Sequence, residues 1–112
     1  MGTELDIGGW NSDGTFPDDF DAEVDQAYSN VNIALQNAGS KGWEQVYSTR
    51  KFVRSLETPT LDAIGRNLAK WTPGQDPLMS IYQVQLWENM AIEIEVEAYV
   101  PVKDSLPTRK SV

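Results

Sequence analysis

The run AIEIEVEAYV at residues 91–100 constrains the fold more than any other stretch, because apolar and polar residues alternate along it. Successive side chains of an extended backbone point to opposite faces, so the alternation predicts a half-buried strand with one apolar face. A helical period of 3.6 residues would instead scatter Glu93, Glu95 and Glu97 around the helix. These three carboxylates repel one another unless solvent, a cation, a hydrogen-bond donor or a neighbouring subunit lies against them.

Two other segments carry a helical pattern. Over residues 18–38 apolar side chains recur at intervals of three and four, with Asp18 or Asp19 suited to cap the first turn and Gly39 suited to end the last. This capping explains the acidic segment PDDFDAE, and a metal site there is the less favoured alternative. A shorter helix is predicted over residues 60–71. Its apolar side is expected to consist of Leu61, Ile64, Leu68 and Trp71.

Three further segments have the composition of strands. ELDI at residues 4–7 is short, whereas VYSTRKFV at residues 46–53 is rich in β-branched and aromatic residues. Residues 78–87 are predicted to be extended and to form an antiparallel hairpin with the final strand. The pattern of residues 46–53 does not identify the buried face of that strand. Arg50 and Lys51 are expected to be solvated, and pairing of either with the glutamates is the alternative.

This order of elements predicts an α+β fold in which both helices pack on one face of the sheet and the other face stays open. Residues 1–102 are predicted to form a single domain and residues 103–112 a polar tail. The open face must contact either water or another copy of the chain. Contact with another copy is favoured, because Tyr82, Trp87 and Tyr99 are expected near that face and aromatic residues are enriched at interfaces.

The formal net charge of -8 limits the classes of partner. Asp and Glu outnumber Lys and Arg by 17 to 9 in the 112 residues, which argues against a nucleic-acid backbone as a partner. The chain has no Cys and no His, so thiolate chemistry is excluded and no metal or cofactor is predicted. No apolar run is long enough to span a membrane, and the first ten residues lack the pattern of a signal peptide. A cytoplasmic or organellar location is therefore expected.

Four runs follow one another along the chain: GGWN at residues 8–11, FDAEVDQAYSNVNIALQNAGSKGWEQVYSTRKFV at 20–53, NLAKW at 67–71 and IEIEVEA at 92–98. In this order they resemble the RidA/YjgF/L-PSP family of reactive intermediate deaminases, especially its fungal-type members. The resemblance covers residues 8–102. It implies a chorismate-mutase-like fold, a homotrimer whose sheets surround a central barrel, and ligand clefts between subunits. The additional first strand of the family is expected to be missing before Gly8.

The resemblance also implies an activity and a set of site residues. Active members hydrolyse enamine and imine intermediates released by amino-acid dehydratases, giving 2-oxo acids and ammonia. Glu97 matches the acidic residue that positions or activates water, and Gly8 and Gly9 match a glycine-containing cleft segment. The arginine that holds the substrate carboxylate in the family corresponds to Met79, which has neither charge nor paired donors. Arg50, or backbone amides near the two glycines, are then the groups left to hold that carboxylate.

Two functions are therefore considered. The first is a RidA-like 2-imino or enamine acid deaminase with Glu97 as its catalytic residue. The second is a non-catalytic trimeric module that binds a small molecule, in which Met79 and Trp87 suit a less charged ligand. A ribonuclease activity is disfavoured, because the acidic charge and the absence of His oppose RNA binding and ordinary acid–base cleavage. A solvated sheet face explains Glu93, Glu95 and Glu97 about as well as a functional role does.

Overall fold

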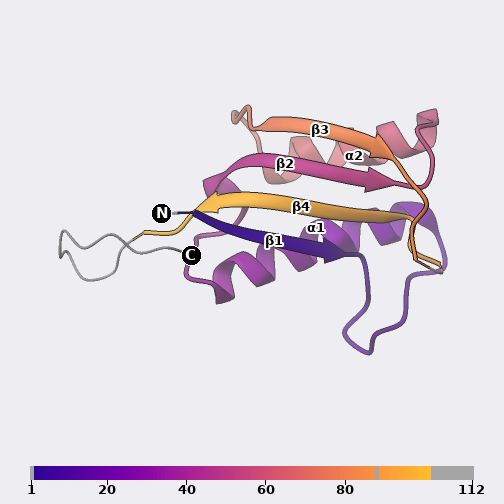
Figure 1. The fold of residues 1–112 in the computed structure, drawn as a ribbon, viewed down its shortest axis with the longest axis horizontal. Coiled ribbons are helices and arrows are strands. Elements are labelled where there is room, and N and C mark those ends of the chain that lie inside the picture. Colours follow the sequence, from indigo (N-terminus) through magenta and orange to yellow (C-terminus); the bar gives the residue numbers. More distant parts are fainter. Residues whose placement is uncertain (1, 88, 102–112) are drawn as a thin grey trace.

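The computed structural model describes residues 2–87 and 89–101, with side chains from Leu5 onward. In this part of the chain the elements are β1 (Gly2–Gly8), α1 (Phe20–Asn37), a 3-10 turn η1 (Trp43–Gln45), β2 (Val46–Val53), α2 (Thr58–Trp71), β3 (Leu78–Gln83) and β4 (Ile92–Tyr99). Both helices lie behind a single sheet in Figure 1, which confirms the predicted α+β arrangement with the helices on one face. The predicted polar tail lies outside the described residues.

The sheet has the strand order β1-β4-β2-β3, with β4 antiparallel to both of its neighbours and β2 parallel to β3 (Figure 1). The predicted hairpin between residues 78–87 and β4 is therefore wrong. Both edges of β4 are already paired, with β1 and β2, so β3 can join the sheet only beyond β2. The α2 crossover brings β3 there in parallel, and the strand ends at Gln83 rather than Trp87. The chain then passes the end of β2 to reach β4.

The apolar core lies between α1 and the central strands. The Asp19 carboxylate caps α1 by accepting from the Asp21 amide at 2.9 Å, and Gly39 follows the helix with a φ of +96°. Tyr28 and Trp43 stack with ring centroids 4.9 Å apart, and the Trp43 indole donates to the Tyr28 carbonyl at 2.8 Å. The buried core side chains of α1 and β4 are Val24, Ala27, Tyr28, Val31, Leu35, Ile92, Ile94, Val96 and Ala98.

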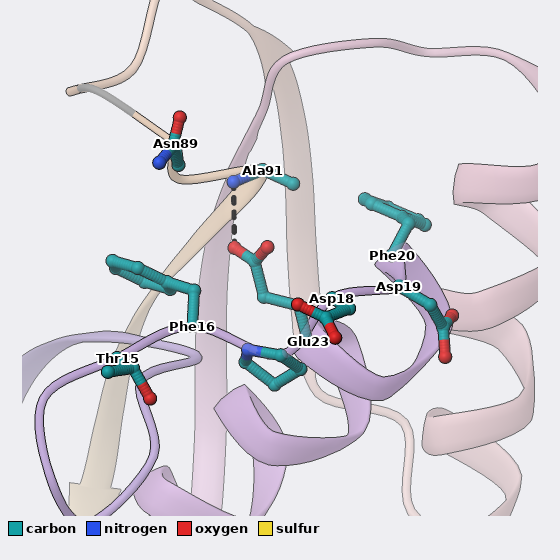
Figure 2. Close-up of a pocket in the computed structure, with 9 residues that line it drawn as sticks. Thr15, Phe16, Asp18, Asp19, Phe20, Glu23, Asn89 and Ala91 are labelled. Carbon is teal, nitrogen blue, oxygen red and sulfur yellow. Dashed lines mark hydrogen bonds between the residues drawn. The ribbon is translucent and has the colours of Figure 1, made fainter.

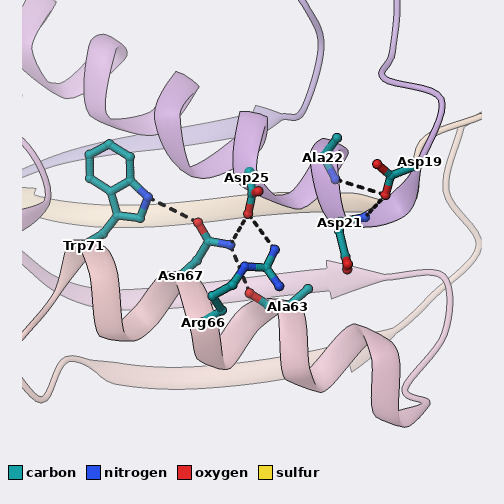
Figure 3. A network of polar contacts seen from close by, with 8 residues as sticks. All are labelled: Asp19, Asp21, Ala22, Asp25, Ala63, Arg66, Asn67 and Trp71. Atoms are coloured by element: carbon teal, nitrogen blue, oxygen red, sulfur yellow. Dashed lines mark hydrogen bonds and ion pairs between the residues drawn. The ribbon is translucent and has the colours of Figure 1, made fainter.

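Helix α2 turns most of its predicted apolar side inward: Ile64 is buried, and Leu68 and Trp71 pack against the core. Leu61 is the exception, because it is 44% exposed. Thr60, Ala63 and Asn67 complete the buried stripe, and two of these residues are polar, so a count of apolar residues alone does not find them. Figure 3 shows why Asn67 lies inside: its amide nitrogen donates to the Asp25 carboxylate at 2.8 Å, and its oxygen accepts from Trp71 at 3.2 Å. A polar network therefore joins α2 to α1.

Candidate functional site

The open face of the sheet, the face that points away from the helices, carries a cluster of opposite charges. The Arg50 guanidinium on β2 bonds to the Glu95 carboxylate on β4, and its Nη1 lies 3.7 Å from Oε1 of Glu97. The two carboxylates therefore share one cation. The expectation that Arg50 is solvated is wrong, and its pairing with the glutamates is confirmed. Glu97 keeps 34% of its side chain exposed, so its carboxylate remains accessible to water or a ligand.

A second pair of carboxyl groups lies next to this cluster, where β1 meets β4. A hydrogen bond with Asp6, partial burial, and repulsion from Asp6 and Glu95 raise the pKa of Glu93 to about 7. Glu93 therefore retains a proton in part of the molecules near neutral pH. That shared proton lowers the repulsion expected among the three glutamates of β4.

Gly9 is required by packing against α1, whereas a Cβ at Gly8 would meet the side chains of Met90 and Trp10. A Cβ at Gly9 would lie 2.2 Å from the backbone oxygen of Glu23, which no side chain can tolerate. The Asn30 amide nitrogen donates to the carbonyls of Gly8 and Trp10, at 3.1 and 2.8 Å, and holds the segment in place. Gly8 pairs with Glu93, four residues along β4 from Glu97, a separation of roughly 13 Å. The predicted ligand role of the two glycines remains a prediction.

Met79 lies on the opposite face of the sheet from Glu97. It pairs with Thr49 of β2, which is buried on the helix-covered face. With Leu68 and Thr72 of α2 and the following loop, Met79 lines a pocket of about 300 Å³. One chain therefore brings Arg50 and Glu97 together but does not bring Met79 to them.

A larger pocket, of about 560 Å³, opens at the start of α1 (Figure 2). The Glu23 carboxylate points to the amide of Ala91 and accepts its hydrogen bond at 2.7 Å, and Phe16, Phe20 and Asn89 complete the walls. Glu23 is 4% exposed, and this burial raises its pKa, partly offset by the backbone hydrogen bonds that it accepts. The sequence analysis explained the acidic segment that contains Glu23 by capping, because the partner of Glu23 lies 68 residues away and no local pattern indicates it.

Lys51 is the other charged residue that the sequence misplaced. It was expected to be solvated, yet it is fully buried on the helix-covered face of β2, between the buried Thr49 and Val53. Burial alone lowers the pKa of Lys51 to about 8, and its ammonium donates to the Thr49 hydroxyl at 2.6 Å. Alternation from Thr49 to Val53 was the available signal, but a lysine is so seldom buried that the pattern was not decisive.

Residues 2–87 and 89–101 contain no group of three or more acidic side chains arranged to hold a metal ion. The turn at Asn11–Gly14 is held by Asp13, whose carboxylate accepts from the Thr15 amide and hydroxyl at 3.0 and 2.6 Å. In the same ranges, no helix combines the length and the apolar character that crossing a membrane requires.

The chain is an α+β protein in which two helices pack on one face of a four-stranded mixed sheet and the other face is open and charged. Residues 7–100 match the family model described as Endoribonuclease L-PSP. Because the match spans most of the chain, the protein belongs to this family, the RidA/YjgF/L-PSP family. The predicted family and fold are thereby confirmed. No curated protein matches the sequence significantly.

Solved structures share the fold. RidA from the Antarctic bacterium Psychrobacter superimposes with a TM-score of 0.77 at 17% identity, covering 86% of this chain and 77% of that one. The Rid family protein YyfB from Yersinia pestis, described as of unknown function, gives 0.69 at 26% identity, covering 85% and 77%. A Rhodopseudomonas palustris protein described as a probable translation initiation inhibitor gives 0.81 at 19% identity, covering 90% and 80%. The structural likeness therefore extends over most of each chain.

Proposed function

We propose that this protein is a Rid-type hydrolase that converts 2-imino or enamine acids to 2-oxo acids and ammonia. Family membership supports a role of this class, because active members carry out this reaction. The observation that carries the proposal is Glu97, which matches the acidic position of the family. Its carboxylate stands half-exposed on the open face, beside the Arg50 guanidinium at 3.7 Å. No metal or cofactor is required for the reaction.

Glu97 acts as the general base in this proposal. Its carboxylate accepts a proton from a water molecule as the water oxygen adds to the carbon of the C=N bond. The nitrogen takes up protons and leaves as ammonia, so that one water is consumed and one C=O bond replaces one C=N bond. An enamine first takes a proton on carbon to become the imine. Arg50 serves as a positioning residue, because it orients the carboxylates of Glu95 and Glu97.

Assembly into a homotrimer belongs to the same proposal. Met79 and Glu97 point to opposite faces of one sheet, so a cleft that contains both positions needs residues of a second copy. The aromatic side chains of the open face support contact with that copy: Tyr82 and Tyr99 are 46% and 47% exposed. A cytoplasmic or organellar location, where dehydratases release such intermediates, is part of this proposal.

Release of 2-oxo acid tests the function. Purified protein is added to an amino-acid dehydratase acting on its substrate, and 2-oxo acid is followed with and without the protein. Acceleration of release beyond the spontaneous hydrolysis in buffer is expected. Equal rates would rule out the deaminase activity and leave the non-catalytic binding module as the function of the scaffold. Although the family model is described as an endoribonuclease, we do not propose RNA cleavage, because the net charge of -8 opposes RNA binding.

A further inference from the structure

Lys51 has no part in the proposed reaction, yet its surroundings indicate a role. Among the described residues it is the only basic side chain that is fully buried. Lysine is almost never buried without a partner, because removing an ammonium from water is costly. The position of this charge in the fold therefore calls for a physical explanation.

The Lys51 ammonium reaches back along β2 to the level of Met79. Its nitrogen donates to the Thr49 hydroxyl at 2.6 Å, and Thr49 pairs with Met79 across the β2–β3 ladder. Residues paired in adjacent strands point to the same face of a sheet, so the ammonium, the hydroxyl and the Met79 side chain are neighbours on the helix-covered face. Met79 in turn lines the pocket of about 300 Å³ beside Leu68 and Thr72.

The hydrogen bonds of this ammonium are incomplete. It has three N–H donors, and in the described part of the chain Thr49 is its single hydrogen-bond acceptor. No carboxylate of the described residues lies within ion-pair distance of it. Lys51 and Thr49 do not line the pocket themselves, whereas Met79, the cross-strand neighbour of Thr49, does. A buried charge with two spare donors, one side chain away from a pocket, is suited to a ligand that brings the opposite charge.

We propose that this pocket binds the carboxylate of a small organic acid, held by the Lys51 ammonium once the flexible Met79 side chain has rotated aside. Lys51 then supplies, from the neighbouring strand, the positive charge that the family carries at the position of Met79. As an account of how the substrate is held, this inference rests on the proposed hydrolase function. Binding of an organic acid at the pocket does not depend on catalysis.

A monocarboxylate fits better than a more highly charged anion. The single charge of one ammonium balances the single charge of one carboxylate, whereas a phosphate dianion would need further cations. Asp76 is exposed at the pocket rim and disfavours additional negative charge. Methionine has three rotatable side-chain bonds and adapts readily to a neighbour, so Met79 can move without a change in the strand.

Each of the other charged groups on the surrounding elements is exposed, lies on the open face or has another partner. On α1, Glu23 accepts from the Ala91 amide and Asp25 accepts from Arg66 and Asn67. Arg50 on β2 and the glutamates of β4 lie on the open face, and Asp62, Arg66 and Lys70 on α2 are exposed. Tyr82 is the ionisable residue of β3, and it stacks on Phe52 on the open face. The proton on Lys51 is therefore expected to control binding. Because its pKa lies near 8, affinity for a carboxylate should fall about tenfold for each pH unit above that value.

Calorimetric titration of the full-length protein with pyruvate tests the inference. Lys51→Met removes the ammonium while keeping the length of the side chain, and Lys41→Met removes an exposed lysine as the matched control. Pyruvate affinity is expected to fall at least tenfold in Lys51→Met and to stay unchanged in Lys41→Met. Met79→Ala, which opens the path to the ammonium, should raise the affinity several-fold. The pH dependence of wild-type binding needs no variant and covers the case in which Lys51→Met does not fold.

Binding that Lys51→Met leaves intact, or wild-type affinity that is constant between pH 7 and pH 10, would overturn the inference. Absence of pyruvate binding to the wild-type protein would do the same, even if 2-oxo acid release were accelerated; the hydrolase function would then stand alone. The reverse result, Lys51-dependent binding without accelerated release, would support the inference and contradict the hydrolase function.

Discussion

Glu23 links two distant parts of the chain through one hydrogen bond. Its carboxylate accepts from the Ala91 amide at the entrance to β4, while its own backbone oxygen lies against Gly9 at the end of β1. Glu23 is 4% exposed, so this hydrogen bond is largely shielded from water and loss of its acceptor is costly. What matters at this position is therefore an acceptor oxygen, not a charge.

Glu23→Gln and Glu23→Ala separate these two contributions. Gln keeps an oxygen for the Ala91 amide and removes a charge that burial disfavours, so the free energy of unfolding should change by less than about 1 kcal/mol. Ala leaves the Ala91 amide without its side-chain acceptor and should lower the free energy of unfolding by about 2–3 kcal/mol. Urea denaturation at pH 7 measures both. Equal losses in the two variants would contradict this role of the carbonyl oxygen.

Residues with distant partners mark the limit of sequence reasoning at this scale. The alternation of β4 was sufficient to place Glu97 and its neighbours, because the two faces of a strand follow from local geometry. The role of Glu23 was missed because its partner, the Ala91 amide, is brought by a distant segment. The burial of Lys51 was missed although its partner Thr49 lies on the same strand, because the pattern of residues 46–53 did not identify the buried face and lysine is generally exposed.

At the scale of elements, the close packing of β1 against α1 depends on Gly9. Gly9→Ala should lower the free energy of unfolding by about 2 kcal/mol or more, because the added methyl overlaps the Glu23 backbone oxygen. Gly65→Ala is the matched control: nothing lies within 4 Å of its Cβ in α2, and alanine should raise stability there by about 0.5–1 kcal/mol. Thermal unfolding measures both changes. Similar shifts for the two variants would show that no close contact exists at Gly9.

The contact between β1 and β4 should make stability depend on pH. The pKa of Glu93 is raised to about 7 in the folded protein, so the folded state binds more protons than the unfolded state above pH 4.5. The favourable contribution of protonated Glu93 is therefore complete below pH 4.5 and is lost as the pH rises through 7. Glu93→Gln should flatten this fall in the denaturation midpoint between pH 5 and pH 8. An identical fall in both proteins would contradict the shared proton with Asp6.

Individual elements were easier to predict than their pairing. The bounds of β2 and the capping of α1 follow from local composition, and both were predicted correctly. The predicted hairpin between β3 and β4 was wrong, because β1 and β2 occupy the two edges of β4. The sequence between the strands does not show which strands pair. On the inward side of α2, Ile64, Leu68 and Trp71 were predicted correctly, whereas Leu61 is exposed and the buried polar Asn67 was missed.

At the scale of the whole molecule, the proposed homotrimer accounts for the open face and for the division of the predicted site residues between two faces of one sheet. Light scattering should give a particle of three times the chain mass of 12.5 kDa. Exposed Tyr82 and Tyr99 on the open face supply apolar area for that contact. A particle with the mass of one chain would exclude a cleft between subunits, and with it the joint use of the Met79 and Glu97 positions.

The central claim is that the Glu97 carboxylate activates water for hydrolysis of an imine. Its most direct test compares the rate of 2-oxo acid release by wild-type protein, Glu97→Gln and Glu44→Gln, in which an exposed glutamate undergoes the same change. General-base catalysis accelerates a reaction by about 10²–10⁴-fold, so Glu97→Gln should reduce kcat at least about a hundredfold. Glu44→Gln should retain the wild-type rate. A wild-type rate in correctly folded Glu97→Gln would contradict the account.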